Sequence, residues 1–183
     1  MRRWGFAVFA IGLVAALAVR AVPPEPPTAE PRFNAQKELL RPEGYREWIF
    51  VGATLGVSYG EKAPANPAFH NLYINPRAYR EYQQSGRFPE GTIIAMENLT
   101  AGQQTSIARH GQFQDQVTGL EAAVKDSSRF PDNWAYFNFT RRGQDPAPTA
   151  TAFPKEACWD CHHQHGATDN VFTQFYPMLR RPK

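Results

Sequence analysis

Cysteine is scarce in this sequence. Cys158 and Cys161 are the only two in 183 residues, so the chain can form at most one internal disulfide. A bridge between them would close a very small loop and would add little stability. A disulfide is one interpretation of an isolated pair in an exported protein. Because so short a loop gains little from a disulfide, the spacing indicates that the two thiols have another role.

The sequence also lacks an excess of charge of one sign once its N-terminus is set aside. Lysine and arginine together number 20, against 17 aspartate and glutamate. Three of the basic residues, Arg2, Arg3 and Arg20, lie in the first 21 positions, and without them the counts are 17 and 17. A chain with no basic stripe has little attraction for polyanions. We therefore predict no nucleic-acid partner.

A comfortable membrane span is missing as well. The apolar run at residues 4–19 has 16 residues, whereas a spanning helix needs about 20. It follows two arginines and ends at Arg20-Ala21, which is typical of a secretory signal. We expect a signal peptide over residues 1–21 and export to the periplasm or beyond, with an N-terminal membrane anchor as the alternative. Residues 22–36 are expected to form a proline-rich arm or linker, and residues 37–183 the main domain.

The main domain shows neither internal repeats nor long helical patterns. Aromatic, β-branched and alternating segments indicate strands instead, and we expect them over residues 45–57, 70–74, 91–99, 119–125 and 133–140. A short helix is expected over 76–84, opened by Pro76 and closed by Gly86. A second, over 155–163, carries the cysteines. The predicted fold class is α+β, mainly an antiparallel β-sheet with short helices and the cysteine-bearing helix near the C-terminus.

The cysteines belong to the sequence Cys158-Trp159-Asp160-Cys161-His162, which has the C-x-x-C-H spacing of c-type haem attachment. On one turn of chain the two thiols reach the two vinyl groups of a porphyrin, and the histidine that follows reaches the iron. We therefore predict one covalently bound haem c with His162 as the proximal ligand. A zinc site is the alternative, with the ligands Cys158, Cys161, His163 and His165.

Further residues carry a resemblance to a known family. Residues 158–163 and 167–177 resemble the C-terminal signature of the cytochrome P-460 / cytochrome c′-beta family. Upstream segments resemble the same family: 45–48, Gly52, 71–73, 88–92 and 124–127. The resemblance implies a largely antiparallel β fold, a homodimer and a pocket for a small ligand on the haem face opposite His162. Some members oxidise hydroxylamine and nitric oxide, whereas the c′-beta members bind nitric oxide and carbon monoxide without known turnover.

Two positions bear on which branch this chain resembles. In the enzymes a lysine on the strand after the Phe-Pro-x-Gly-Thr segment is crosslinked to the haem edge, and the matching position here is Met96. The enzymes also use a distal carboxylate, which Glu121 matches. Glu121 is thus a candidate proton relay, with a solvated surface charge as the alternative. Met96 is a candidate sixth iron ligand or distal cap, with core packing as the alternative. We expect alternation to place Ile94 and Met96 on one strand face.

Three functions follow from these residues. The first is a cytochrome that binds nitric oxide or a related nitrogen oxide at the iron. The second is an electron-transfer cytochrome with His162 and Met96 as ligands. The third is a hydroxylamine or nitric oxide oxidoreductase that uses Glu121. A redox partner protein is expected for the electron-transferring functions. The remaining histidines, His70, His110, His163 and His165, are expected to be surface residues or contacts of the haem propionates.

Overall fold

The computed structural model describes Met1 and residues 29–59, 61–103 and 110–180. The expected signal peptide from residue 2 onward and residues 22–28 of the expected arm lie outside the described residues. Within these ranges, no helix has the length and apolar character needed to cross a membrane.

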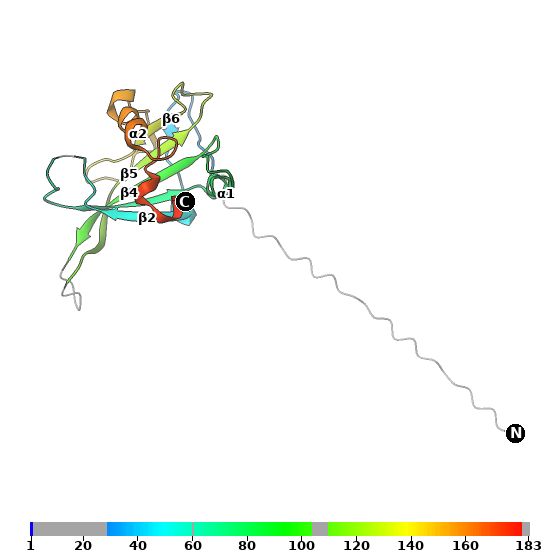
Figure 1. The fold of residues 1–183 in the computed structure, drawn as a ribbon, viewed down its shortest axis with the longest axis horizontal. Helices are drawn as coiled ribbons and strands as arrows, with labels where there is room; N and C mark the ends of the chain where they lie inside the picture. Colours follow the sequence, from blue (N-terminus) through cyan, green and yellow to red (C-terminus); the bar gives the residue numbers. More distant parts are fainter. Residues whose placement is uncertain (2–28, 60, 104–109, 181–183) are drawn as a thin grey trace.

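An antiparallel five-stranded sheet forms the body of the domain (Figure 1). Its strands follow one another in chain order: β2 (Ile49–Leu55), β3 (Ala68–Ile74), β4 (Ile93–Gly102), β5 (Phe113–Lys125) and β6 (Trp134–Asn138). Strands β1 (Leu39–Leu40) and β7 (Thr149–Ala150) pair separately. The helices α1 (Pro76–Ser85) and α2 (Trp159–His165) are short. Four 3-10 turns complete the set: η1 (Tyr45–Glu47), η2 (Lys155–Ala157), η3 (Thr173–Phe175) and η4 (Pro177–Leu179). The predicted fold class is confirmed.

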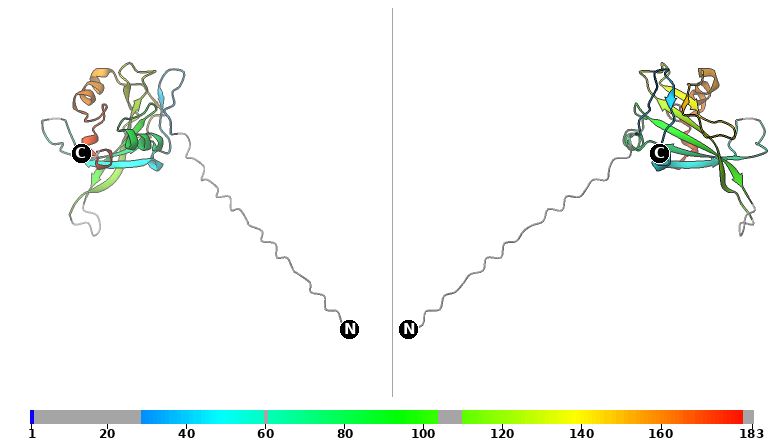
Figure 2. Two further views of the ribbon diagram at one scale, coloured as in Figure 1. Left: turned by 45° about the vertical axis from the view of Figure 1, so that its right-hand side comes forward. Right: turned by 180° about the vertical axis from the view of Figure 1, so that it is seen from behind.

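Side-chain alternation along the strands builds a separate core on each face of the sheet. On β4, Ile94 and Met96 pack into one cluster, together with Leu72 of β3 and Tyr136 of β6. Ile93 and Ala95 pack into the other cluster with Leu120 and Phe137. We call the first of these the cavity face, because α2 and the C-terminal segment lie over it (Figure 2).

Two expected elements differ from those observed in the type of structure that they form. The segment 45–57 begins as the 3-10 turn η1, and the strand starts only at Ile49. The segment 155–163 is not one helix, because Cys158, with φ −135° and ψ −48°, separates η2 from α2. Helix α1 follows its prediction, with Pro76 in its first turn and Gly86 in the left-handed conformation at its end.

A bulge in β2 lets the C-terminal segment lie close to the sheet. The pairing of β2 with β3 shifts between Phe50 and Gly52, and a glycine inside a strand often marks such a bulge. Gly52 has φ +143°, and a Cβ atom there would lie 3.1 Å from Cδ1 of Tyr176. On the other side, the Tyr82 hydroxyl of α1 donates to the Leu179 carbonyl oxygen at 2.6 Å. The C-terminal segment is therefore held close to β2 and is also bonded to α1.

Candidate haem site

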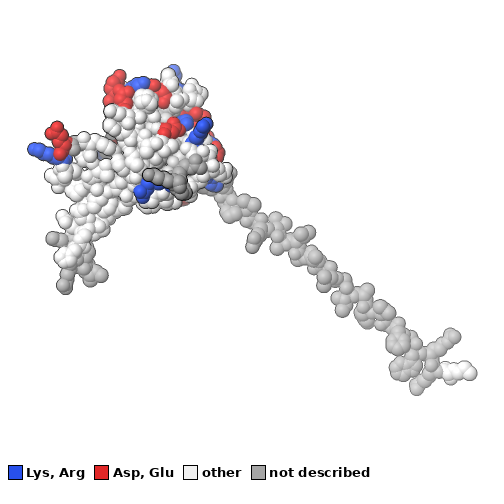
Figure 3. All heavy atoms as spheres, viewed as in Figure 1, with Lys and Arg blue, Asp and Glu red and all other residues white. Residues whose placement is uncertain are grey.

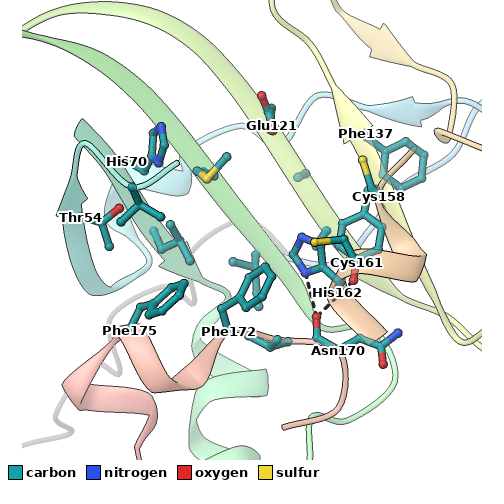
Figure 4. A pocket seen from close by; sticks show the side chains of 18 of the residues that line it. Thr54, His70, Glu121, Phe137, Cys158, Cys161, His162, Asn170, Phe172 and Phe175 are labelled. Carbon is teal, nitrogen blue, oxygen red and sulfur yellow. Dashed lines mark hydrogen bonds between the residues drawn. The ribbon is translucent and has the colours of Figure 1, made fainter. Parts of the chain in front are cut away.

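A cavity of about 300 Å³ lies between the cavity face of the sheet, α2 and the C-terminal segment (Figure 4). Its lining is mainly apolar and includes Leu72, Ile94, Ala123, Val171 and Phe172. Cys158, Cys161 and His162 line it from the α2 side, and Met96, Glu121 and His70 from the sheet. The structure therefore brings together the residues that the sequence singled out.

Helix α2 presents the two thiols and the imidazole to this cavity. Cys158 precedes the helix and Cys161 and His162 lie within its first turns, and all three are partly buried. Both cysteines are free thiols. Two contacts to the turn before β6 fix the helix: Trp159 Nε1 donates to the Asp132 carbonyl oxygen at 3.0 Å, and Lys155 pairs with the Asp132 carboxylate at 2.8 Å.

The His162 ring has one nitrogen committed and one available. Its Nδ1 lies 2.9 Å from the carbonyl oxygen of Asn170. Since a carbonyl oxygen only accepts, Nδ1 carries the proton and Nε2 keeps its lone pair. Burial lowers the pKa of His162, and the hydrogen bond to Asn170 opposes this only in part. A neutral imidazole whose second nitrogen is anchored on a carbonyl is the usual arrangement of an iron-binding histidine.

The carbonyl that anchors His162 is itself held by strands β5 and β6. Asn170 has φ +61°, and its carbonyl oxygen also accepts a hydrogen bond from the Tyr136 hydroxyl at 3.2 Å. The neighbouring Asp169, with φ +47°, accepts from Lys125 Nζ at 2.6 Å and from Trp134 Nε1 at 3.2 Å. Sequence reasoning missed this support. The Asp-Asn pair was a usable signal, because these residues tolerate positive φ better than most others.

Met96 and Glu121 lie opposite each other on the sheet side of the cavity. They are direct partners in the β4–β5 register. Ile94 and Met96 both line the cavity, which confirms that they share a strand face. No lysine is among the described residues that line the cavity. The Met96 thioether therefore lies in the part of the cavity wall where the resemblance would place the crosslinking lysine.

Glu121 is partly buried rather than solvated. Desolvation raises the pKa of its carboxyl group, and a hydrogen bond from Asn98 Nδ2, at 3.3 Å from Oε1, acts in the opposite direction. A carboxyl group in such surroundings keeps its proton to a higher pH than usual. The location fits the proton-relay hypothesis better than a surface charge, and the relay itself stays a prediction.

His70 is partly buried and lines the cavity from β3, so it is not a surface histidine, while its contact with a haem propionate stays a prediction. Burial lowers the pKa of its imidazole. Figure 4 shows His70 and Thr54 across the cavity from His162. His110, His163 and His165 are exposed, as expected. Sequence alternation on residues 70–74 held the missed signal, because Leu72 and His70 share a face.

These residues fit a haem better than they fit zinc. An apolar cavity with one available imidazole nitrogen and two free thiols beside it suits a porphyrin whose iron takes an axial histidine. Zinc needs four ligands that converge on a point. Among the described residues, no three His, Cys, Asp or Glu side chains are grouped to hold a metal ion, and His163 instead stacks on Trp159 with ring centroids 4.4 Å apart.

The family model for cytochrome P460 matches residues 42–173, the greater part of the chain. The chain belongs to the cytochrome P460 family. Its membership makes it a haem-binding cytochrome, and the matched range includes both cysteines, His162, Met96 and Glu121. No curated protein matches this chain.

Proposed function

We propose that this member of the cytochrome P460 family is an exported c-type monohaem cytochrome that binds small uncharged molecules, nitric oxide above all, at its haem iron. The observation that carries the proposal is the arrangement of His162. Its Nδ1 is anchored on the Asn170 carbonyl oxygen at 2.9 Å, while the ring lines an apolar cavity together with both free thiols.

Covalent attachment is the first part of the proposal. Cys158 and Cys161 hold the haem through thioethers, each formed when a thiol S–H adds across a porphyrin vinyl group. Their positions on either side of the first turn of α2 support this, as does the arginine-flanked apolar leader of the sequence, because haem attachment of this type takes place outside the cytoplasm. His162 provides the proximal iron ligand.

Ligand choice is the second part. The haem supplies an iron that binds small molecules, and the residues around it decide which ones enter. Leu72, Ile94 and Phe172 line the cavity with apolar atoms, which disfavours ions because burying a charge without a partner is costly. Uncharged diatomic molecules bear no such cost. Glu121, with its raised pKa, is the one carboxyl group on the described lining, and in this proposal it serves as a proton relay.

Electron transfer with ligation by His162 and Met96 is the second candidate, favoured by the presence of Met96 in the same cavity. The two candidate functions differ in what occupies the sixth coordination position of the iron, which is Met96 in electron transfer and an added small molecule in ligand binding. If Met96 is a ligand, Met96→Ala converts a low-spin spectrum to high-spin and speeds ligand binding. Met178→Ala is the matched control, since Met178 is 44% exposed. An unchanged spectrum in Met96→Ala would assign Met96 to packing.

Hydroxylamine oxidation is the weaker alternative. Lys125, on β5, is held by the Phe88 carbonyl oxygen at 2.9 Å and by Asp169 at 2.6 Å, so it is not available at the cavity wall. The proposal therefore includes no lysine–porphyrin crosslink and little turnover of hydroxylamine.

The proposal extends to a homodimer. Large apolar side chains are exposed on β2 and β5, at 44% for Phe50, 42% for Leu55, 38% for Phe113 and 45% for Val117. Figure 3 displays few charged side chains over the lower part of the domain, where the β4–β5 hairpin projects. Exposed apolar patches of this kind are typical of protein interfaces.

Absorption spectra of the ferric and ferrous holoprotein, with and without nitric oxide, test the proposed function. We expect the ferrous spectrum to change on adding nitric oxide at micromolar concentration, while the protein keeps its haem. Spectra that stay the same with saturating nitric oxide would contradict ligand binding and favour electron transfer.

A further inference from the structure

Three polar residues on neighbouring strands form a group beside the apolar cavity, and two of them line it. His70 of β3 is the direct register partner of Asn98 of β4, and Asn98 Nδ2 donates to Glu121 Oε1 of β5 at 3.3 Å. His70 and Glu121 line the cavity. Figure 4 shows both side chains projecting from the sheet. We call His70, Asn98 and Glu121 the polar corner.

Hydrogen bonding in the polar corner is incomplete. Asn98 Oδ1 is buried and has no hydrogen-bond partner within the described ranges. An unpaired buried acceptor is destabilising, so such atoms in native proteins are normally satisfied by water or a ligand. The His70 ring, partly buried as well, has no hydrogen bond to the part of the chain that is described. The polar corner therefore has unused hydrogen-bonding groups that are available to a water or a ligand.

The apolar residues around the polar corner limit the kinds of molecule that can bind there. Next to the corner, the cavity wall consists of Leu72, Ile94 and Met96, which offer no hydrogen-bond donor. A donor in apolar surroundings forms a stronger hydrogen bond than one in water. A neutral imidazole has one N–H group, and His70 lies across the cavity from His162. His70 is therefore placed to contact the side of a ligand that faces away from His162.

We propose that His70 donates a hydrogen bond to the outer atom of a small ligand of the haem iron, and so selects ligands whose outer atom is a good acceptor. Asn98 Oδ1 holds a water beside this contact. The inference rests on the proposed function, because it requires a ligand at the iron. It adds a specificity residue, which favours nitric oxide or dioxygen over carbon monoxide.

Three variants of the full-length holoprotein test the inference. His70→Leu removes both ring nitrogens, His70→Gln retains a donor, and His110→Leu removes an exposed histidine as the matched control. The measurements are the C–O stretching frequency of the ferrous carbon monoxide complex, which falls when the oxygen accepts a hydrogen bond, and the dissociation rate of nitric oxide. Circular dichroism on each variant checks that the fold is retained.

We expect His70→Leu to raise the C–O stretching frequency and to speed nitric oxide dissociation by about tenfold, the equivalent of about 1.4 kcal/mol. His70→Gln should lie close to the wild type, and His110→Leu should match it. Equal frequencies and rates in wild type and His70→Leu would overturn the inference. So would a change from six- to five-coordinate iron in His70→Leu, because the imidazole would then be bonded to the iron itself. A wild type that binds neither gas would instead contradict the proposed function.

Discussion

At the scale of the residue, the orientation of His162 depends on a chain of contacts that starts in the sheet. Lys125 and Trp134 hold the Asp169 carboxylate, and Asp169 precedes Asn170, whose carbonyl oxygen takes the His162 Nδ1 proton. The rings of Tyr136 and Phe172 flank the imidazole, with centroids 4.3 and 4.5 Å from its own. Strands β5 and β6 thereby fix the side chain that is proposed to bind the iron.

Asp169→Ala should destabilise the protein because it removes two hydrogen bonds, one of them to a charged donor that is 15% exposed. We expect a loss of about 1–3 kcal/mol in the free energy of unfolding, measured by urea denaturation. The control is Asp115→Ala, at an exposed position of β5. Equal losses in the two variants would show that the Asp169 contacts contribute nothing specific.

The partly buried carboxyl group of Glu121 should make the free energy of unfolding depend on pH. Desolvation raises its pKa in the folded state, so folding favours the protonated form. The stability that this group contributes is present below its ordinary pKa, near 4.5, and is lost as pH rises through the raised value. Glu121→Gln removes the titration. The variant should therefore gain stability relative to the wild type as pH rises from below 4.5 through the raised pKa of Glu121.

Urea denaturation of both proteins at several pH values measures this difference, and comparing the two cancels the contribution of other titrating groups. A relative stability of Glu121→Gln that stays constant, or that falls as pH rises, would show that the carboxyl group is solvated in the folded protein.

At the scale of the element, sequence periodicity predicted the sheet well and its ends poorly. In the second half of β5, Leu120, Ala122 and Val124 are buried and alternate with the partly buried Glu121 and Ala123, because burial of one face imposes a period of two. The first half of β5, from Phe113, is exposed and carries no such pattern. It was therefore missed.

The residues of the candidate site also divide into those that the sequence predicts and those that it does not. The C-x-x-C-H spacing is local in the chain, so Cys158, Cys161 and His162 could be chosen from the sequence. The support from Asp169 and Tyr136 depends on how a loop folds back on two strands. His70 depends on which face of β3 meets the cavity. The local signals, the Asp-Asn pair and the alternation on residues 70–74, indicate a backbone conformation and a strand face, but not which parts of the chain come into contact.

Gly52 tests how closely the C-terminal segment must approach β2. Its φ of +143° is unfavourable for other residues, and a Cβ atom would lie 3.1 Å from the Tyr176 ring. We expect Gly52→Ala to lower the free energy of unfolding by about 2 kcal/mol and to displace Tyr176 from the cavity wall. Gly111→Ala is the control, since Gly111 has φ +93° but nothing within 4 Å of the added atom.

Calorimetry and tyrosine fluorescence measure the two effects. If Gly52→Ala costs no more than Gly111→Ala, backbone strain alone accounts for the loss, and the contact with Tyr176 is not required.

At the scale of the whole molecule, the chain places an apolar cavity between a five-stranded sheet and a short helix that is held by the turn before β6. The sheet supplies Met96, Glu121 and His70, and the helix supplies the two thiols and His162. Because the cysteines and the histidine belong to one helical segment, a haem attached there would be held on the side of the cavity opposite His70. The proposed ligand binding, the alternative of electron transfer and the proposed role of Met96 all depend on that attachment.

Mass spectrometry of the denatured, acid-acetone-extracted protein tests the attachment most directly. We expect the polypeptide to keep a mass increment of one haem, located on the peptide that contains Cys158 and Cys161, and we expect Cys158→Ser with Cys161→Ser to abolish it. Complete loss of haem from the wild type on extraction, or zinc in place of iron in the purified protein, would contradict the account.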